Sequence, residues 1–492
     1  MKQKKIFLVA LLISSIFSGY FLNPENIGLS GSGSILYNDF RSINPACISN
    51  HKGMSINMLG GSFGFGNDFL SISDYNDING ANFDDPTSTK YFPKSDFLGL
   101  FNNGFGINGQ VYLPIPFSNF VYNNISFSSR TYFWFETVFP ESLMDLTLYG
   151  NQFNKQYDMT FENSIDLINE HSIGYANTLG SFSYGFRLKY IQGLANSKLK
   201  SISPNSSYFS TDSLGFLGKA EYLMSQSIGG SSIALDLGII SDETFNDWNF
   251  GISITNLFAR VKWDKNNITY NYLKNSIIDQ LPLRNNEKQY FSINLDTLNA
   301  INMINLPANQ IYDFEKFPIV EVYDINNIEF INVIYNEIGD STYVSNYGKI
   351  ISTDYGSYLI ESTNIPDEVL DTLNADFKEK ISQYPVNFHL GAYKEVDENI
   401  LLTIDLSTGF NNSNQTSENW KLSTGLVFER FEKFPLTMGF SIGGKNKFNS
   451  GFSLGYKQGP FQLTYALGTR NGIFIPSWRG LDFSFSAIFK IN

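Results

Sequence analysis

Apolar and polar residues alternate over long stretches of this chain, and most regularly near its end. In residues 481–491 one series is Leu481, Phe483, Phe485, Ala487, Phe489 and Ile491, and the other is Asp482, Ser484, Ser486, Ile488 and Lys490. A period of two predicts a β-strand with one apolar face. A strand of this length can cross a hydrocarbon core at a tilt.

The same alternation recurs at 461–467, 436–442, 402–406 and 182–190. Further strands are predicted at 53–61, 105–113, 119–135, 172–179, 181–191, 194–203, 232–240 and 247–257. Together with seven strands in the region 385–491, this makes a total of roughly 14 to 16, and an even number is expected of a membrane barrel. The fold class is therefore all-β, a transmembrane antiparallel β-barrel of about 14 strands.

Alternation alone also fits a soluble sandwich, in which the apolar face points into a core. Two features favour the membrane barrel, in which the apolar face meets lipid and the polar face lines the lumen. The strands exceed the usual length of about five or six residues in soluble sheets. Small residues on the polar face (Gly425, Gly439, Ser441, Gly455) suit a curved, closed sheet.

The N-terminus reads as an export signal, which also favours the membrane barrel. Lys2, Lys4 and Lys5 precede an apolar run that ends near Phe17, and Ser18-Gly19 follows as a candidate cleavage region. The run is short for a spanning helix, so we predict a signal peptide over residues 1–19 rather than an N-terminal membrane anchor. The chain then belongs outside the cytoplasm, in the cell outer membrane.

Loop lengths predict the topology. If the chain ends in the periplasm, the connections at 395–398, 431–433 and 457–460 are periplasmic, and those at 411–418, 444–449 and 469–479 face outward. The periplasmic set is the shorter, as membrane barrels prefer.

Between about 262 and 384 the barrel pattern stops. This stretch contains short apolar runs and a candidate amphipathic helix at Asp367–Ile381. A structureless loop of this length is unusual, so we predict an inserted α+β subdomain, extracellular by strand parity. The predicted organisation is signal peptide 1–19, plug-like segment 20–52, barrel 53–261, inserted subdomain 262–384 and barrel 385–492.

Composition narrows the function classes. The net charge of -13 argues against nucleic acid, because phosphate binding requires clustered Lys and Arg. Phe and Tyr are abundant (45 and 28 residues), which suits aromatic side chains that face lipid. The single cysteine, Cys47, cannot form an internal disulfide, and we interpret it as structural.

Catalytic and metal-binding patterns are not found in the sequence. The histidines His51, His171 and His389 are scattered without ligand spacing. The glycine-rich run 28–33 lacks the lysine of a phosphate-binding loop. We therefore predict no enzyme activity, no metal and no cofactor.

The alternation assigns faces to candidate site residues. The lumen-facing candidates are Arg187, Lys189, His389, Asp405 and Asp482. The lipid-facing candidates are Leu481, Phe483, Phe485 and Phe489.

Several segments resemble one superfamily of barrels. Residues 27–50, with Gly31-Ser32-Gly33 and then Asn44-Pro45-Ala46, resemble the N-terminal stretch of barrels related to the long-chain fatty-acid transporter. The run PLTMGFSIGG…FNSGFSLGYKQGPFQLTYALG (435–468) resembles the closing hairpins of that superfamily, which includes the type IX secretion shuttle barrels. SSRTYFWFETVFPESLMDLTLYGN (128–151) and GSFSYGFRLKYIQGLANSKL (180–199) resemble a Bacteroidota-type branch without a characterised function. The chain departs from the pattern at its last residue, Asn492, where such barrels usually end on an aromatic residue.

The resemblance implies a barrel of about 14 strands whose N-terminal segment enters the lumen from the periplasmic side. Asn44, Pro45 and Ala46 would then belong to a plug or gate; a tight turn before the first strand explains them equally well. The implied function is passive uptake of a hydrophobic or amphipathic small molecule through the outer membrane. The alternative is a non-transporting surface scaffold, or a secretion-associated barrel, that binds a protein partner through residues 262–384.

Overall fold

The computed structural model describes residues 23–102, 104–201, 206–213, 215–241, 244–263, 268–276, 287–295, 320–324, 329–335, 351–353, 356–359, 381–410 and 417–491. The predicted signal peptide lies outside these residues, and so does the candidate helix Asp367–Ile381 except for Ile381, which begins a β-strand instead. No helix among the described residues is long and apolar enough to cross a membrane.

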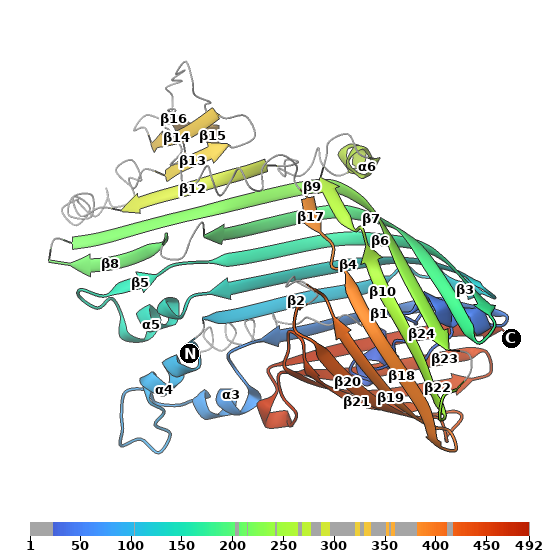
Figure 1. The fold of residues 1–492 in the computed structure, drawn as a ribbon. Helices are drawn as coiled ribbons and strands as arrows, with labels where there is room; N and C mark the ends of the chain where they lie inside the picture. Colours follow the sequence, from blue (N-terminus) through green and yellow to red (C-terminus); the bar gives the residue numbers. More distant parts are fainter. Residues whose placement is uncertain are drawn as a thin grey trace.

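The described chain forms a closed antiparallel barrel of 14 strands, which confirms the predicted fold class (Figure 1). The wall strands, in order, are β1 (Met54–Asn67), β2 (Phe105–Pro114), β4 (Ile125–Phe139), β6 (Glu162–Leu179), β7 (Phe182–Ser201), β9 (Gly215–Ser241), β10 (Trp248–Leu257), β18 (Asn387–Asp397), β19 (Ile400–Thr408), β20 (Lys421–Phe428), β21 (Leu436–Gly443), β22 (Phe448–Gln458), β23 (Phe461–Arg470) and β24 (Gly480–Ile491). The pairing of β24 with β1 closes the wall, so the first and last wall strands are not left as free edges.

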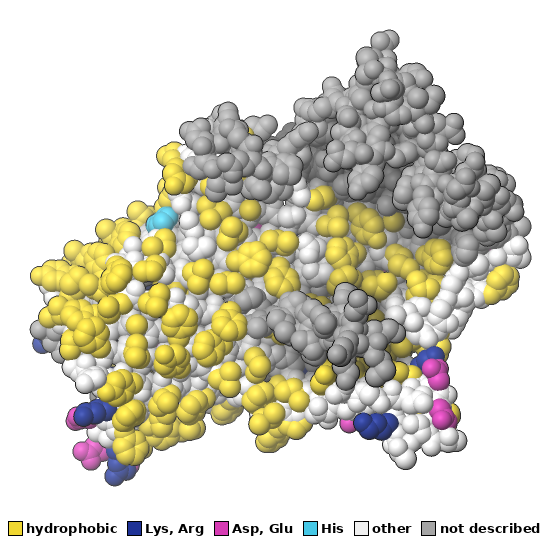
Figure 2. All heavy atoms as spheres, turned by 180° about the vertical axis from the view of Figure 1, so that it is seen from behind, with side chains coloured by type: hydrophobic (Ala, Val, Ile, Leu, Met, Phe, Trp, Pro, Cys, Tyr) yellow, Lys and Arg dark blue, Asp and Glu magenta, His cyan; other side chains and the backbone are white. Residues whose placement is uncertain are grey.

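The two faces of the wall differ as the alternation predicts. On β7 the side chains of Phe182, Tyr184, Phe186 and Leu188 are exposed, whereas the intervening Ser183 and Arg187 are buried. Figure 2 shows hydrophobic side chains spread over the back of the wall, with Lys, Arg, Asp and Glu gathered along its lower margin. Exposed apolar side chains outside and buried polar ones inside are the arrangement of a barrel that meets lipid.

The wall is much taller on one side than the sequence pattern predicts. The strands predicted at 181–191 and 194–203 are one strand, β7, with a register shift near Gly193 where β7 pairs with β6. The strand predicted at 232–240 begins at Gly215, and the one predicted at 172–179 begins at Glu162. The extra residues were missed because their alternation is interrupted by bulges, which shift one face by a residue.

The predicted strand 119–135 is two strands, β3 (Asn119–Tyr122) and β4. Strand β3 pairs with both β1 and β4, and so continues the line of β2 after a short break in the wall. Additional short elements are β5 (Gln156–Asp158) and β8 (Tyr208–Asp212), the helices α3 (Ile72–Ile78), α4 (Lys94–Gly99) and α5 (Glu141–Tyr149), and the 3-10 helix η4 (Ile475–Ser477).

The connections fall into a short and a long set. Those beside the C-terminus are short, at 180–181, 398–399, 429–435 and 459–460. The other end, here called the loop end, carries the long connections 68–104, 140–161, 409–420 and 471–479 together with the insertion, and also a short connection, 444–447. The pattern has the asymmetry predicted from the sequence; which end faces outward stays a prediction.

The insertion starts and ends as part of the sheet. Strand β11 (Arg260–Trp263) pairs with β9 and with β17 (Ile381–Gln383), so both ends of the insertion join the wall. Helix α6 (Ile268–Ser276) follows β11. Strands β12 (Glu287–Leu295), β13 (Val320–Asp324) and β14 (Glu329–Tyr335) extend the sheet from the edge of β9, and β15 (Ile351–Thr353) and β16 (Gly356–Leu359) follow.

Candidate functional site: a plugged lumen

The segment that precedes the barrel lies inside it. Residues 24–34 are almost all buried, and the short helix α2 (Pro24–Gly28) contacts β22, β23 and β24. The 3-10 helix η1 (Pro45–Asn50) contacts β6, β7 and β9 on the opposite wall. We call residues 23–52 the plug segment.

Glycines on the inner wall make room for the plug segment. Eight lie in cross-strand pairs: Gly425 with Gly439, Gly439 with Gly451, Gly451 with Gly468, Gly185 with Gly238, and Gly251 with Gly391. A Cβ atom on Gly185 would lie 2.5 Å from the backbone nitrogen of Ala46, and one on Gly439 would overlap the backbone of Leu29.

The pattern extends to other strands. Gly251, Gly391 and Gly468 also approach the plug segment. We call these eight residues the glycine belt. Because only glycine lacks the Cβ atom, the belt lets the plug backbone approach the wall more closely than side chains would permit.

Asn44 fastens the plug segment to the wall. Its side-chain carbonyl accepts a hydrogen bond from Ala46 N (2.9 Å) and thereby caps η1, and Pro45 occupies the first helical position. Its amide donates to the carbonyls of Ile239 (3.1 Å) and Ile252 (3.0 Å). The Asn-Pro-Ala motif therefore starts a 3-10 helix and also joins the wall. A gating role stays a prediction.

Hydroxyl groups attach the middle of the plug segment to β19. Ser32 Oγ lies 2.7 Å from Thr403 Oγ1, and the hydroxyl of Ser34 donates to the carboxyl group of Asp405. The backbone N–H of Ser34 also donates to Asp405 (3.2 Å). Asp405, predicted to face the lumen, thus anchors the plug segment.

A buried ionic cluster holds the turn where the plug segment reverses. Arg41 donates to Glu25 (2.5 Å) and to Asp39 (2.8 Å), and Lys490 of β24 lies 2.9 Å from Asp39. Burial alone would raise the pKa of Asp39, but Arg41 and Lys490 hold it below its usual range, so the carboxylate stays ionised. Breaking such a cluster leaves an unpaired buried charge, which is strongly destabilising.

A second ionic cluster lines the tall side of the wall. Asp236 lies 3.2 Å from Arg187 and 2.9 Å from Lys189, and Glu170 lies 3.4 Å from Lys189 and 3.3 Å from Arg130. Arg187 also donates to the carbonyl of Ser42 in the plug segment (3.3 Å). The two predicted lumen-facing cations are therefore brought together with two carboxylates.

A cavity of about 100 Å³ lies between this cluster and the plug segment. Its charged lining residues are four cations and two carboxylates: Arg41, Arg130, Arg187, Lys189, Glu170 and Asp236. Aromatic rings complete the lining: Phe40, Tyr112, Tyr132, Tyr384 and Phe485. We call it the cationic cavity, because its lining cations outnumber its lining carboxylates.

The cationic cavity reaches a break in the wall. Strand β1 pairs with β2 over Ser62–Asn67 and with β3 over Met54–Asn57, so residues 58–61 have no ladder partner on that edge. Gly60, Gly61 and Pro114 at this break line the cavity. Phe485 also lines it, although Phe485 alternates with the buried Ser484 and Ser486 and so stands at an outward position.

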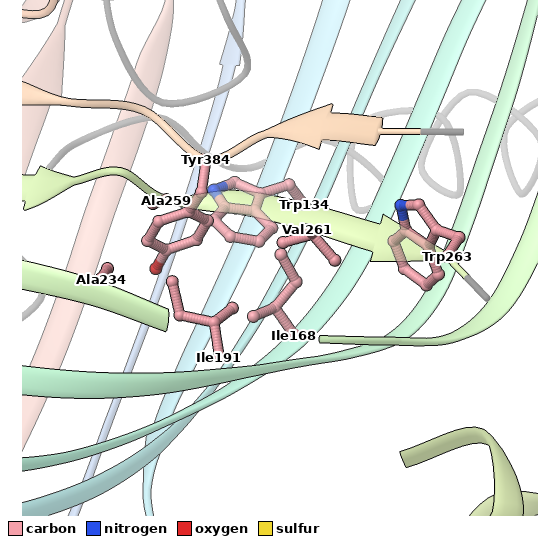
Figure 3. Close-up of a cluster of buried hydrophobic side chains, with 8 residues drawn as sticks. All are labelled: Trp134, Ile168, Ile191, Ala234, Ala259, Val261, Trp263 and Tyr384. Carbon is pink, nitrogen blue, oxygen red and sulfur yellow. The ribbon is translucent and has the colours of Figure 1, made fainter. Parts of the chain in front are cut away.

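An apolar cluster covers the loop-end side of the second ionic cluster (Figure 3). It consists of Trp134, Ile168, Ile191, Ala234, Ala259, Val261, Trp263 and Tyr384, contributed by wall strands and by the ends of the insertion. Tyr384 joins the two clusters, because its hydroxyl donates to Glu170 (3.2 Å). A packed apolar cluster thus lies directly beside a charged one, and of its members only Tyr384 lines the cationic cavity.

The remaining predicted site residues are distributed over the barrel. His389 is buried and lines a separate polar cavity of about 110 Å³ near the loop end. Asp482 pairs with Arg470 of β23. On the outer face Leu481 is exposed, Phe483 packs against Phe63 with ring centroids 5.2 Å apart, and Phe489 packs against Phe461 at 5.1 Å.

Sequence reasoning missed the partners of these residues. Asp236 lies in the strand predicted at 232–240, on the same face as Ala234. Its inward-facing position could therefore have been predicted from the alternation. The proximity of Glu170 and Arg130 could not be predicted, because it depends on where β6 begins and on the register between β4 and β6. Glu25, Asp39 and Arg41 carry no periodic signal, because the plug segment is mostly irregular. Among the described residues, no group of three or more His, Cys, Asp or Glu is placed to bind a metal ion.

Comparisons with known proteins complete the description. No family model matches the chain, and no curated protein does. Among solved structures it is similar to a Pseudomonas aeruginosa FadL homologue (10% identity, 97% of this chain and 100% of that one, TM-score 0.42). It is also similar to the Ralstonia pickettii toluene transporter TbuX (10%, 96% and 99%, 0.45) and to a deltaS2S3 mutant of the monoaromatic hydrocarbon channel TodX (10%, 96% and 98%, 0.46). Similarity at this level does not establish the function of this chain.

The glycine belt makes a testable prediction about stability. Gly439→Ala adds a methyl group that overlaps the Leu29 backbone, so we expect a loss of about 1–3 kcal/mol, typical of overpacking. Thermal unfolding in detergent measures the loss. Gly99→Ala, in helix α4 with no heavy atom within 4 Å of the added Cβ, is the matched control and should be neutral or slightly stabilising. Equal stability of the two variants would contradict the claim that the plug backbone packs closely against the glycine belt.

Proposed function

We propose that this chain is an outer-membrane barrel for passive uptake of amphipathic small molecules with an acidic group. The observation that carries the proposal is the cationic cavity, which adjoins the apolar cluster and reaches the break in the wall. Residues 1–19 would serve as the export signal, and the loop end would face outward. Likeness to the fatty-acid transporter superfamily, including its type IX and Bacteroidota-type members, belongs to the same proposal.

The lining chemistry selects the substrate class. An acidic group gains charge-assisted hydrogen bonds from arginines in a site of low dielectric constant. A hydrocarbon chain gains by leaving water for the aromatic rings that line the cavity, among them Phe40, Tyr132 and Phe485. A purely polar solute gains only the hydrogen bonds, and a neutral hydrocarbon gains only the removal of its apolar surface from water.

The break in the wall between β2 and β3, opposite residues 58–61 of β1, supplies a route that does not require removal of the whole plug segment. Residues 58–61 lack ladder partners on that edge, so side-chain movement there costs no wall hydrogen bonds. The exposed apolar side chains of Leu59, Leu113 and Phe117 stand beside it on the outer face. A substrate leaving the cationic cavity sideways would therefore enter lipid.

Arg130→Gln tests the uptake proposal. Removing one lining cation should reduce uptake of a radiolabelled long-chain fatty acid roughly tenfold, because a hydrogen bond to a charged group is worth about 1.5–3 kcal/mol. Toluene uptake should change little. Lys445→Gln removes a cation that pairs with Glu136 away from the cavity and is the matched control. Heat-modifiable gel mobility verifies that each variant is folded.

Two results would contradict uptake: fatty-acid entry that is the same with and without the wild-type barrel, or equal effects of Arg130→Gln and Lys445→Gln.

A protein-binding scaffold is the second candidate, and the sheet beyond the wall favours it. Strand β12 pairs with residues 218–226 of β9, and β13 and β14 continue the sheet outward. Because Lys262 pairs with Ile381, a short turn can replace residues 264–380 and keep the β11–β17 pairing and the 14 wall strands, although β9 loses its partner β12. We expect this deletion to remove a co-purifying partner while fatty-acid uptake persists. A partner retained by the deletion variant would exclude the insertion as its binding element.

A further inference from the structure

The outer face of the tall wall changes from apolar to polar along each strand. On β7 the outward series Phe182, Tyr184, Phe186, Leu188 and Tyr190 ends at Gln192. At a rise of about 3.3 Å per residue and a tilt of about 40°, these positions span roughly 25 Å along the barrel axis. This is the height of the apolar band of membrane barrels, so Gln192 lies where the hydrocarbon region ends.

Outward-facing polar groups gather at the same height. His171 of β6 bonds Ser129 of β4 through Nδ1 (2.8 Å) and Gln192 through Nε2 (3.1 Å). One register step away, Thr131 donates to Asn169 (2.7 Å). Hydrogen-bonded side chains across three strands mark a boundary where lipid tails give way to headgroups.

Two cations extend this boundary onto β11. Arg260 and Lys262 are exposed and alternate with Val261 and Trp263, which are buried in the apolar cluster inside the barrel. Arg260 and Lys262 therefore face outward. Lys262 pairs with Ser231, and Ser231 pairs with Gln192. The two cations therefore continue the row of outward-facing polar side chains at the height of Gln192, which we call the polar row.

Helix α6 lies on the outer wall beside these cations. Thr269 Oγ1 is 3.3 Å from the hydroxyl of the outward Tyr190, and the backbone of α6 at Tyr270 closely approaches Gly229. Thr269 and Leu273 are buried against the wall, whereas Ile268 (78% exposed) and Tyr272 (71% exposed) stand one turn apart on the free face. An apolar residue and a tyrosine exposed at this height suit the membrane interface.

We infer that β11 and α6 form a binding site for the phosphate group of an anionic membrane lipid. Arg260 and Lys262 would bind the phosphate, with Ile268 and Tyr272 in the adjacent headgroup layer. The charge of the row is complementary to a lipid phosphate, and the guanidinium of Arg260 suits bidentate contact with its oxygens. The inference rests on the proposed membrane embedding but not on uptake.

Native mass spectrometry of the full-length barrel in non-ionic detergent tests the site. The probes are diphosphoryl lipid A, phosphatidylglycerol and phosphatidylcholine. The double variant Arg260→Gln/Lys262→Gln should bind the phosphate-bearing anionic lipids roughly thirtyfold more weakly, because each cation near an anionic lipid contributes about 1 kcal/mol. Lys394→Gln/Lys457→Gln, two cations at the opposite end, is the matched control and should bind as the wild type does.

The outcomes separate the possibilities. Loss of both anionic lipids supports recognition of the phosphate itself, and loss of lipid A alone supports a site for an outer-leaflet glycolipid phosphate. Unchanged binding in the double variant, or equal retention of phosphatidylcholine by the wild type, would overturn the site. Fatty-acid uptake measured on the same preparations distinguishes the two proposals, since either can fail while the other holds.

Discussion

The structure depends on the close approach between the plug backbone and the glycine belt. At Gly439, Gly451 and Gly185 a side chain would occupy the space taken by plug main-chain atoms. This packing confers stability only if the polar groups of the plug segment are satisfied inside the lumen. Asn44 and Asp405 bond the segment to the wall, and Arg41 binds Glu25 and Asp39. The glycines thus determine where the segment runs, and the polar contacts determine its register.

A lumen packed in this way separates two kinds of space. The cationic cavity lies on the tall side, beside the wall break, whereas a cavity of about 180 Å³ lies toward the turns and is lined by Glu429, Lys457 and Lys490. Arg41 lines both cavities, so its ionic cluster forms part of the partition between them. The unequal height of the wall also explains where polar groups lie on the outer surface. The tall strands continue beyond the apolar band, and the polar row and the insertion lie on this extension.

Much of the barrel was predictable, because alternation survives wherever one face meets lipid. The seven strands after residue 385 and β10 were located to within about three residues at each end. The tall parts of β6, β7 and β9 were not, since bulges and contacts on both faces interrupt the period of two. Of the site, Arg187, Lys189 and Asp405 were identifiable as inward-facing polar residues. Their partners required registers between strands far apart in sequence, and the ionic cluster of the irregular plug segment has no periodic signature.

The accessibility of Cys47 tests the central claim that the plug segment is held in the glycine belt. Cys47 is buried in η1, and burial raises the pKa of its thiol to about 12, so in the intact barrel it should resist N-ethylmaleimide at pH 7.5. Gly185→Leu, placed against the backbone of Ala46, should displace η1 and increase the alkylation rate at least tenfold, with unchanged heat-modifiable mobility of the barrel. Rapid alkylation of the wild type, or equal rates in both proteins, would contradict the account.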